Sequence, residues 1–174
     1  MNVNDILKKL EELGKNAKPG YREGMARFGI VSSSALGVSL PEIRKLAKEI
    51  GKNHELALSL WQMKIHEAKM IATLIDEPKL VTENQMDTWV NDFYSWDICD
   101  QCCSNLFDKT QFYKRKIEQW IKSEKEFVRR AGFVLMATSA VHDKKAPDEQ
   151  FLEYLPLIKQ YSYDKRNFVK KAVN

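Results

Sequence analysis

Signals for helix starts and helical spacing of apolar residues run along the whole chain, whereas signals for strands are nearly absent. Apolar residues recur three and four positions apart, as in Ile6, Leu10 and Leu13, the spacing that places side chains on one face of a helix. No Asn-Gly or Asp-Gly pair marks a hairpin, and no stretch alternates β-branched residues as a half-buried strand would. The sequence therefore predicts an all-α protein.

Capping residues mark several of the helix boundaries. The segments 39–42, 82–85 and 123–126 each begin with Ser or Thr and end with Glu or Gln. This is the pattern of a capping box, in which the two side chains satisfy unpaired amides of a first helical turn. Gly14 and Gly51 follow LKKLEEL and IRKLAKEI, and we expect both to be C-terminal caps.

Three tryptophans suggest that the helices are paired. Trp61, Trp89 and Trp120 lie near predicted helix ends, 28 and 31 residues apart, and the polar start of another helix follows each of them. This spacing predicts a HEAT-like α-solenoid of stacked antiparallel helix pairs, with residues 1–174 as a single repeat domain. An irregular helical bundle is the alternative, because three tryptophans do not distinguish the two.

In a solenoid, the first helices of successive pairs would line a concave face. The residues expected to be exposed there are Glu67, Asp97, Asp100, Arg129, Arg130, Lys170 and Lys171. The net charge of +4 is unevenly distributed: residues 1–64 carry +4, residues 65–108 carry −7 and residues 109–174 carry +7. Two basic segments on either side of an acidic one suit the binding of a polyanion at its ends. The alternative is a solvated surface on which charge is unevenly distributed.

Composition excludes several classes of protein. The chain has no apolar run of the roughly 18–20 residues that a membrane span requires, and charges interrupt the N-terminal segment too often for a signal peptide. Its three cysteines are clustered and odd in number, which is not a disulfide framework and favours a cytoplasmic location.

The segment YSWDICDQCC, residues 94–103, holds all three cysteines, a tryptophan and two aspartates. Cys99 and Cys102 have C-x-x-C spacing, but a structural zinc site needs a second pair of ligands, and the three histidines are isolated from one another. A redox pair would need a thioredoxin-like βαβ setting. We therefore predict structural cysteines, no metal and no cofactor.

The carboxylates of this segment allow two interpretations. Ser95 is a predicted N-cap, and acids such as Asp97 are common in a first turn because they complement the helix dipole. Asp100 lies four residues after Trp96, so the two side chains share one helix face. A carboxylate beside an indole is suited to binding a cation, since the acid offers charge and the ring face offers cation–π attraction. The residues alone leave both interpretations open.

Four segments, taken in order, resemble the DNA alkylation repair (AlkD-like) family of HEAT-repeat DNA glycosylases. They are GVSLPEIRKLAKEIGKN, LW with the following IHEAKMIA, WVNDFYSWDICDQCC, and FVRRAGFVLMA. The resemblance runs from about residue 20 to the end of the chain. W-D-x-x-D after a Trp-Val helix, together with a later Arg-Arg helix, is its most specific part.

This resemblance implies roles for particular residues. Trp96 and Asp100 match the catalytic tryptophan and aspartate, and Arg130, with Arg129 as the alternative, matches a phosphate-contacting arginine. Where some members have Tyr and Gln at the edge of the site, this chain offers Phe28 and Ser39. We expect the family's second site tryptophan to fall just after Asn174. The further DNA-binding residues expected are Lys165, Arg166, Lys170 and Lys171.

The resemblance also implies an activity, namely excision of cationic alkylated purines such as 3-methyladenine and 7-methylguanine from duplex DNA. The expected partner is therefore double-stranded DNA that contains alkylated bases, bound by a monomer without a metal. Two rival hypotheses are a HEAT-like DNA-binding protein without glycosylase activity and a helical scaffold for another protein.

Overall fold

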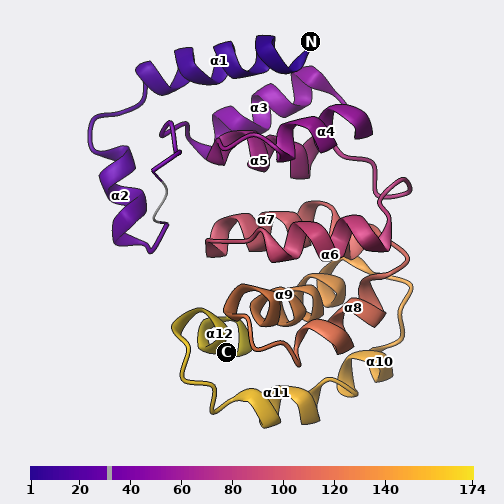
Figure 1. Ribbon diagram of the computed structural model, residues 1–174. Coiled ribbons are helices and arrows are strands. Elements are labelled where there is room, and N and C mark those ends of the chain that lie inside the picture. Colours follow the sequence, from indigo (N-terminus) through magenta and orange to yellow (C-terminus); the bar gives the residue numbers. More distant parts are fainter. Residues whose placement is uncertain (31–32) are drawn as a thin grey trace. The chain divides into compact units, whose positions relative to one another are not determined.

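The computed structural model describes residues 1–30 and 33–174, and this part of the chain contains helices and no strand (Figure 1). The all-α prediction is therefore confirmed. By its internal contacts the chain divides into two compact units, residues 1–81 and 82–174, which are described separately below. The expectation of one repeat domain stays a prediction.

The first unit is built around α5. Its helices are α1 (Val3–Lys15), α2 (Tyr21–Arg27), α3 (Leu40–Ile50), α4 (His54–Trp61) and α5 (His66–Ile75). α5 packs against α3 and α4, and α1 packs against α4 and α5. Ile6, Leu10, Leu60, Trp61 and Ile71 are fully buried in this core. Trp61 ends α4, as its position in the sequence predicted.

Glu67 lies inside the first unit with none of its surface exposed, so the prediction of an exposed Glu67 is wrong. Its carboxylate accepts hydrogen bonds from three successive main-chain amides, those of Leu36, Gly37 and Val38, at 2.8–3.2 Å. Amides of a buried loop need an acceptor, and a carboxylate provides one without a helix or strand. Glu67 therefore holds the loop that leads into α3.

The second unit is built around the long helix α9. Its helices are α6 (Glu83–Asn91), α7 (Trp96–Asn105), the 3-10 helix η1 (Phe107–Lys109), α8 (Tyr113–Trp120), α9 (Glu126–His142), α10 (Asp148–Leu152), α11 (Leu155–Tyr161) and α12 (Asn167–Val173). α9 packs against α6, α7, α8, η1 and α12. Phe107 is buried beside Trp89 and Trp120, with ring centroids 6.4 and 5.8 Å away.

The three cysteines are fully buried between α7 and α9. The thiols of Cys99 and Cys103 lie 3.7 Å from the carbonyl oxygens of Phe127 and Ala131, which belong to α9. Burial raises the pKa of the Cys103 thiol well above its ordinary value, which keeps it protonated and unreactive. The cysteines act as small packing residues, in agreement with the sequence-based interpretation.

Candidate functional site

The acidic segment predicted as a site begins α7. Ser95 is the N-cap residue, and its hydroxyl donates a 2.6 Å hydrogen bond to Asp97, whose carboxylate also accepts the amide of Ile98 at 2.9 Å. Asp97 is 9% exposed, so the prediction that it lies open on a face is wrong. Its carboxylate serves the first turn of the helix, which has amides without intrahelical acceptors.

Trp96 and Asp100 come one turn apart on the same helix, as predicted. Trp96 is the first residue of α7, and both residues are half-buried. The Asp100 side chain keeps 29% of its surface exposed, in contrast to the buried Asp97. Of the two aspartates, Asp100 is therefore the one that a ligand can reach.

The guanidinium of Arg130, on α9, lies edge-on to the Asp100 carboxylate. Arg130 Nε donates to one carboxylate oxygen at 2.8 Å, and a terminal nitrogen donates to the other at 2.7 Å. The second terminal nitrogen donates to the carbonyl of Phe168 at 2.6 Å. Such a two-point contact fixes the plane of the carboxylate as well as its distance. Arg130 is 7% exposed, so the prediction that it lies open on a face is wrong.

Burial raises the pKa of the Asp100 carboxyl above its ordinary value, because an ionised group is poorly solvated there. The hydrogen bonds and charge of Arg130 act in the opposite direction, and the nearby charge of Asp97 raises the pKa slightly further. Perturbed carboxyl groups of this kind are common where a protein does chemistry.

A second charge cluster surrounds Asp164. Its carboxylate accepts hydrogen bonds from Arg129 at 2.7 Å and from both the main chain and the guanidinium of Arg166. Arg129 also contacts Glu124 at 3.0 Å and lies 4.8 Å from the ring centre of Tyr161. The hydrogen bonds of Arg166 hold the pKa of Asp164 well below its ordinary value. Arg129 is 8% exposed and was also predicted to be open, which is wrong because it is bound to the buried carboxylate of Asp164.

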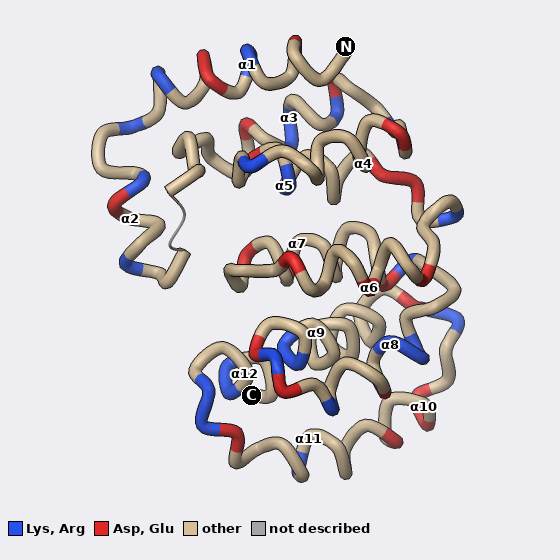
Figure 2. Tube along the Cα trace, viewed as in Figure 1, with Lys and Arg blue, Asp and Glu red and all other residues tan. Residues whose placement is uncertain are grey.

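The other predicted DNA contacts of this unit are lysines. Lys165, Lys170 and Lys171 are exposed; Lys165 lies in the loop before α12, and Lys170 and Lys171 lie within α12. Figure 2 shows Lys and Arg, in blue, on α12 and on the segment that leads into it. The Lys171 ammonium lies 6.0 Å from the ring centre of Phe168. These three lysines can approach a polyanion without breaking a buried ion pair.

Phe28 and Ser39 belong to the first unit. Phe28 follows the last residue of α2 and is 72% exposed. Ser39 is the N-cap of α3, and its hydroxyl donates to Glu42 at 2.6 Å. Their part in a site with Asp100 stays a prediction.

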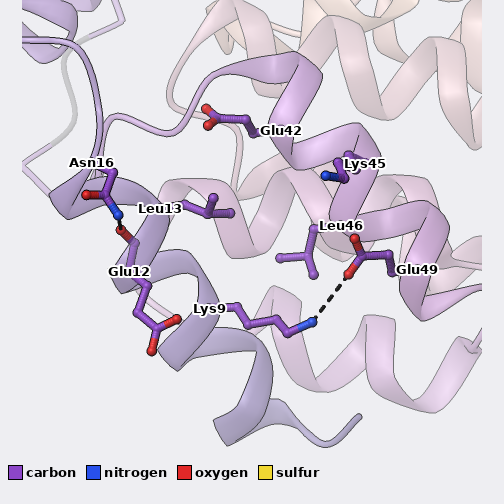
Figure 3. A pocket seen from close by; sticks show the side chains of 8 residues that line it. All are labelled: Lys9, Glu12, Leu13, Asn16, Glu42, Lys45, Leu46 and Glu49. Atoms are coloured by element: carbon purple, nitrogen blue, oxygen red, sulfur yellow. Dashed lines mark hydrogen bonds and ion pairs between the residues drawn. The ribbon is translucent and has the colours of Figure 1, made fainter.

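Two cavities lie away from these residues. One, of about 360 Å³, lies between α1 and α3, where Lys9 and Glu49 form a 3.3 Å ion pair over Leu46 (Figure 3). The other, of about 250 Å³, is mostly apolar and is lined by residues of α9, α10, α11 and α12. Neither is lined by Trp96 or Asp100. Among the described residues there is no group of three or more His, Cys, Asp or Glu placed to hold a metal, and no helix long and apolar enough to cross a membrane.

Sequence reasoning missed three contacts around the predicted arginines. The Asp164 carboxylate accepts from Arg129, the main-chain carbonyl of Phe168 accepts from Arg130, and the Glu126 carboxylate accepts from the amide of Phe168. The two residues of each contact are 35–42 positions apart along the chain, and no periodic pattern connects residues at such distances.

Comparisons with known proteins agree with this picture. The family model described as DNA alkylation repair enzyme matches residues 9–174. A solved structure from "a new family of proteins related to the HEAT-like repeat DNA glycosylases with affinity for branched DNA structures" is similar, with a TM-score of 0.83. The similarity covers 99% of this chain and 73% of that one at 21% identity, which confirms the HEAT-like fold. No curated protein matches the sequence. Because the family match spans nearly all of its length, the chain belongs to the DNA alkylation repair enzyme family.

Proposed function

We propose that this protein is a DNA glycosylase that hydrolyses the N-glycosidic bond of cationic alkylated purines, such as 3-methyladenine and 7-methylguanine, in duplex DNA. The observation that carries the proposal is the Asp100 carboxylate, held in one plane by Arg130 while 29% of its side chain stays exposed. Membership of the DNA alkylation repair enzyme family supports the substrate class.

The chemistry needs only one carboxylate. A purine alkylated at a ring nitrogen carries a positive charge, and it becomes neutral when it leaves with the electron pair of the glycosidic bond. Positive charge then builds on the sugar, as in other glycoside hydrolyses with oxocarbenium-like transition states. An ionised Asp100 stabilises that charge and orients a water, whose oxygen bonds to the anomeric carbon while its proton passes to the carboxylate or to solvent.

Trp96 and Arg130 support this role of Asp100. The indole ring of Trp96, one turn before Asp100, would pack against a cationic nucleotide through its face. Arg130 lowers the pKa of Asp100 against the effect of burial, which favours the ionised carboxylate that the reaction needs. The remaining donor capacity of Arg130 would go to a phosphate of the DNA backbone.

The basic residues of the second unit would hold the backbone. Lys165, Lys170 and Lys171 are exposed and supply sequence-independent affinity. Arg129 and Arg166 would contact phosphates only in competition with Asp164, so we assign them a secondary part. Phe28 and Ser39 would contact DNA from the first unit.

The test is release of 7-methylguanine from methylated duplex DNA by the intact protein, the Asp100→Asn variant and an Asp148→Asn control. Asp148 is exposed at the start of α10, so its replacement makes the same change in charge outside α7 and α9. We expect Asp100→Asn to lose at least about 100-fold in rate, as when one electrostatic stabiliser is removed, while it still binds DNA. Equal release by both variants would remove Asp100 from the mechanism.

A second candidate function is binding of branched DNA without base release. It is favoured by the similar solved structure, whose proteins are described as having affinity for branched DNA structures. It predicts tighter binding to a four-way junction than to a duplex of the same length, and release of 7-methylguanine only at the spontaneous rate. Measuring both quantities on the same preparation distinguishes the two functions.

A further inference from the structure

Two side chains of opposite charge hold the main chain of one residue in α12. Glu126 and Arg130 lie one turn apart at the start of α9. Glu126 accepts the amide of Phe168 at 3.0 Å, and Arg130 donates to the carbonyl of Phe168 at 2.6 Å. The rings of Phe127 and Phe168 add a contact, with centroids 5.3 Å apart. Side chains of α9 therefore bind both the amide and the carbonyl of Phe168.

The amide of Phe168 needs an acceptor from outside its own helix. Phe168 is the second residue of α12, and amides in a first turn have no intrahelical partner. Glu126 supplies that partner and places a negative charge near the helix start, where it is favoured. A seven-residue helix has little stability of its own, so this contact contributes to where α12 begins.

The carbonyl of Phe168 is in turn one of three acceptors around the Arg130 guanidinium. The other two are the oxygens of Asp100, so each guanidinium nitrogen has an acceptor. Because the guanidinium is planar and rigid, three contacts in different directions fix its orientation. Loss of the Phe168 contact would let the group rotate away from the plane of the Asp100 carboxylate.

We propose that Glu126 is a positioning residue for the glycosylase reaction, acting through the main chain of Phe168 to hold Arg130 against Asp100. The catalytic role of Glu126 rests on the proposed function. Its physical content, that Glu126 controls the contact between Arg130 and Asp100, is independent of activity and can be measured separately.

The sign of the pKa change separates positioning from a simple effect of charge. Removing a nearby negative charge lowers the pKa of a carboxyl, because the ionised form is less repelled. Loss of the Arg130 contact raises the pKa of Asp100, because the hydrogen bonds and charge that lower it are removed. Glu126→Ala removes a negative charge in either case. Positioning predicts that it also breaks the contact of Arg130 with Asp100, and that this second effect dominates.

The experiment is a carbon-13 NMR titration of the Asp100 carboxyl in the intact protein and in the variants Glu126→Ala, Glu126→Asp and Glu126→Gln. The Asp100 signal is identified by its absence from Asp100→Asn. We expect Glu126→Ala to raise the pKa of Asp100 by about 0.5 unit or more. Glu126→Asp keeps the charge, but its side chain is one methylene shorter, so it should also raise the pKa of Asp100. Glu126→Gln keeps an oxygen that can accept the Phe168 amide, so it should show no rise.

The control is Glu118→Ala, which removes one exposed carboxylate from α8 in the same unit and should leave the pKa of Asp100 unchanged. A fall or no change in both Glu126→Ala and Glu126→Asp would overturn the proposal. If Glu126→Ala does not fold, Glu126→Asp compared with Glu126→Gln gives the same answer. The acid limb of 7-methylguanine release should move with the pKa of Asp100. If no variant releases base but the pKa pattern holds, only the glycosylase function fails.

Discussion

Arg130 approaches Asp100 from 30 positions away in the sequence and contacts both carboxylate oxygens, at 2.8 and 2.7 Å. This contact opposes the effect of burial, which raises the pKa of Asp100. Whether Asp100 is ionised at a given pH therefore depends on a residue of another helix. In the proposed reaction that ionised form is the active one.

The pH dependence of base release follows from this relationship. Folding raises the pKa of Asp100. As the pH decreases, release should therefore begin to fall at a higher pH than it would if Asp100 had the ordinary aspartate pKa of 3.8. Arg130→Ala removes hydrogen bonds and a charge that lower the pKa, so the acid limb should move to higher pH. Single-turnover rates with DNA fully bound, measured across pH, separate this shift from weaker binding. An acid limb that does not move in Arg130→Ala would contradict the prediction.

Asp164 should contribute to stability in a pH-dependent way. The hydrogen bonds of Arg166 and Arg129 lower its pKa in the folded state. The stabilisation is therefore present above the unfolded pKa and is lost as the pH falls through the lower folded value. Asp164→Asn should reduce the free energy of unfolding by about 2–3 kcal/mol at pH 7, the size expected for lost hydrogen bonds to charged groups.

Urea denaturation at pH 7 and at progressively lower pH measures this contribution. The difference between the intact protein and Asp164→Asn should shrink only below the ordinary pKa range of aspartate. Asp148→Asn, at an exposed position that begins α10, is the matched control and should change stability by less than about 0.5 kcal/mol. A constant difference at all pH values would exclude ionisation of Asp164 as the source.

The salt dependence of DNA binding tests the exposed lysines. Replacing Lys170 and Lys171 by Gln should lower the slope of log K against log salt by about 1.8, if each lysine neutralises one phosphate of duplex DNA. The matched control is the double variant Lys144→Gln with Lys145→Gln. It makes the same change in charge just after the C-terminal end of α9. Fluorescence anisotropy at several salt concentrations gives both slopes. Equal slopes for the two double variants would show that net charge, and not the surface of α12, determines the affinity.

Local features of the fold could be predicted from the sequence because their parts are close along the chain. The capping box of Ser39 and Glu42 and the C-cap at Gly51, with φ of 77°, occur as predicted. Gly14 was predicted wrongly as a cap, since α1 continues to Lys15 and Asn16 ends it. The segment 123–126 was also misassigned, because α9 begins only at Glu126.

The pairing of Trp96 with Asp100 on one helix was predicted, because it follows from their spacing of four. Contacts between residues far apart in the sequence could not be predicted. The contact of Asp164 with Arg129 joins residues 35 positions apart, and it depends on how α11 and α12 return to α9. Sequence periodicity shows which face of a helix is apolar, but it does not show which charged residues meet across two helices.

Gly132, in α9, packs directly against Ile121, the C-cap residue that ends α8. A Cβ atom at this position would lie 2.8 Å from the main-chain nitrogen of Ile121 and 2.7 Å from its side chain, so the two segments would have to separate. Gly132→Ala should lower the free energy of unfolding by about 1–3 kcal/mol, as overpacking of a core does. Gly24, in α2, has nothing within 4 Å of the same atom, and Gly24→Ala should stabilise by about 0.5–1 kcal/mol. Urea denaturation of both variants checks the pair, and stabilisation by both would mean that α8 can move away from α9 at little cost.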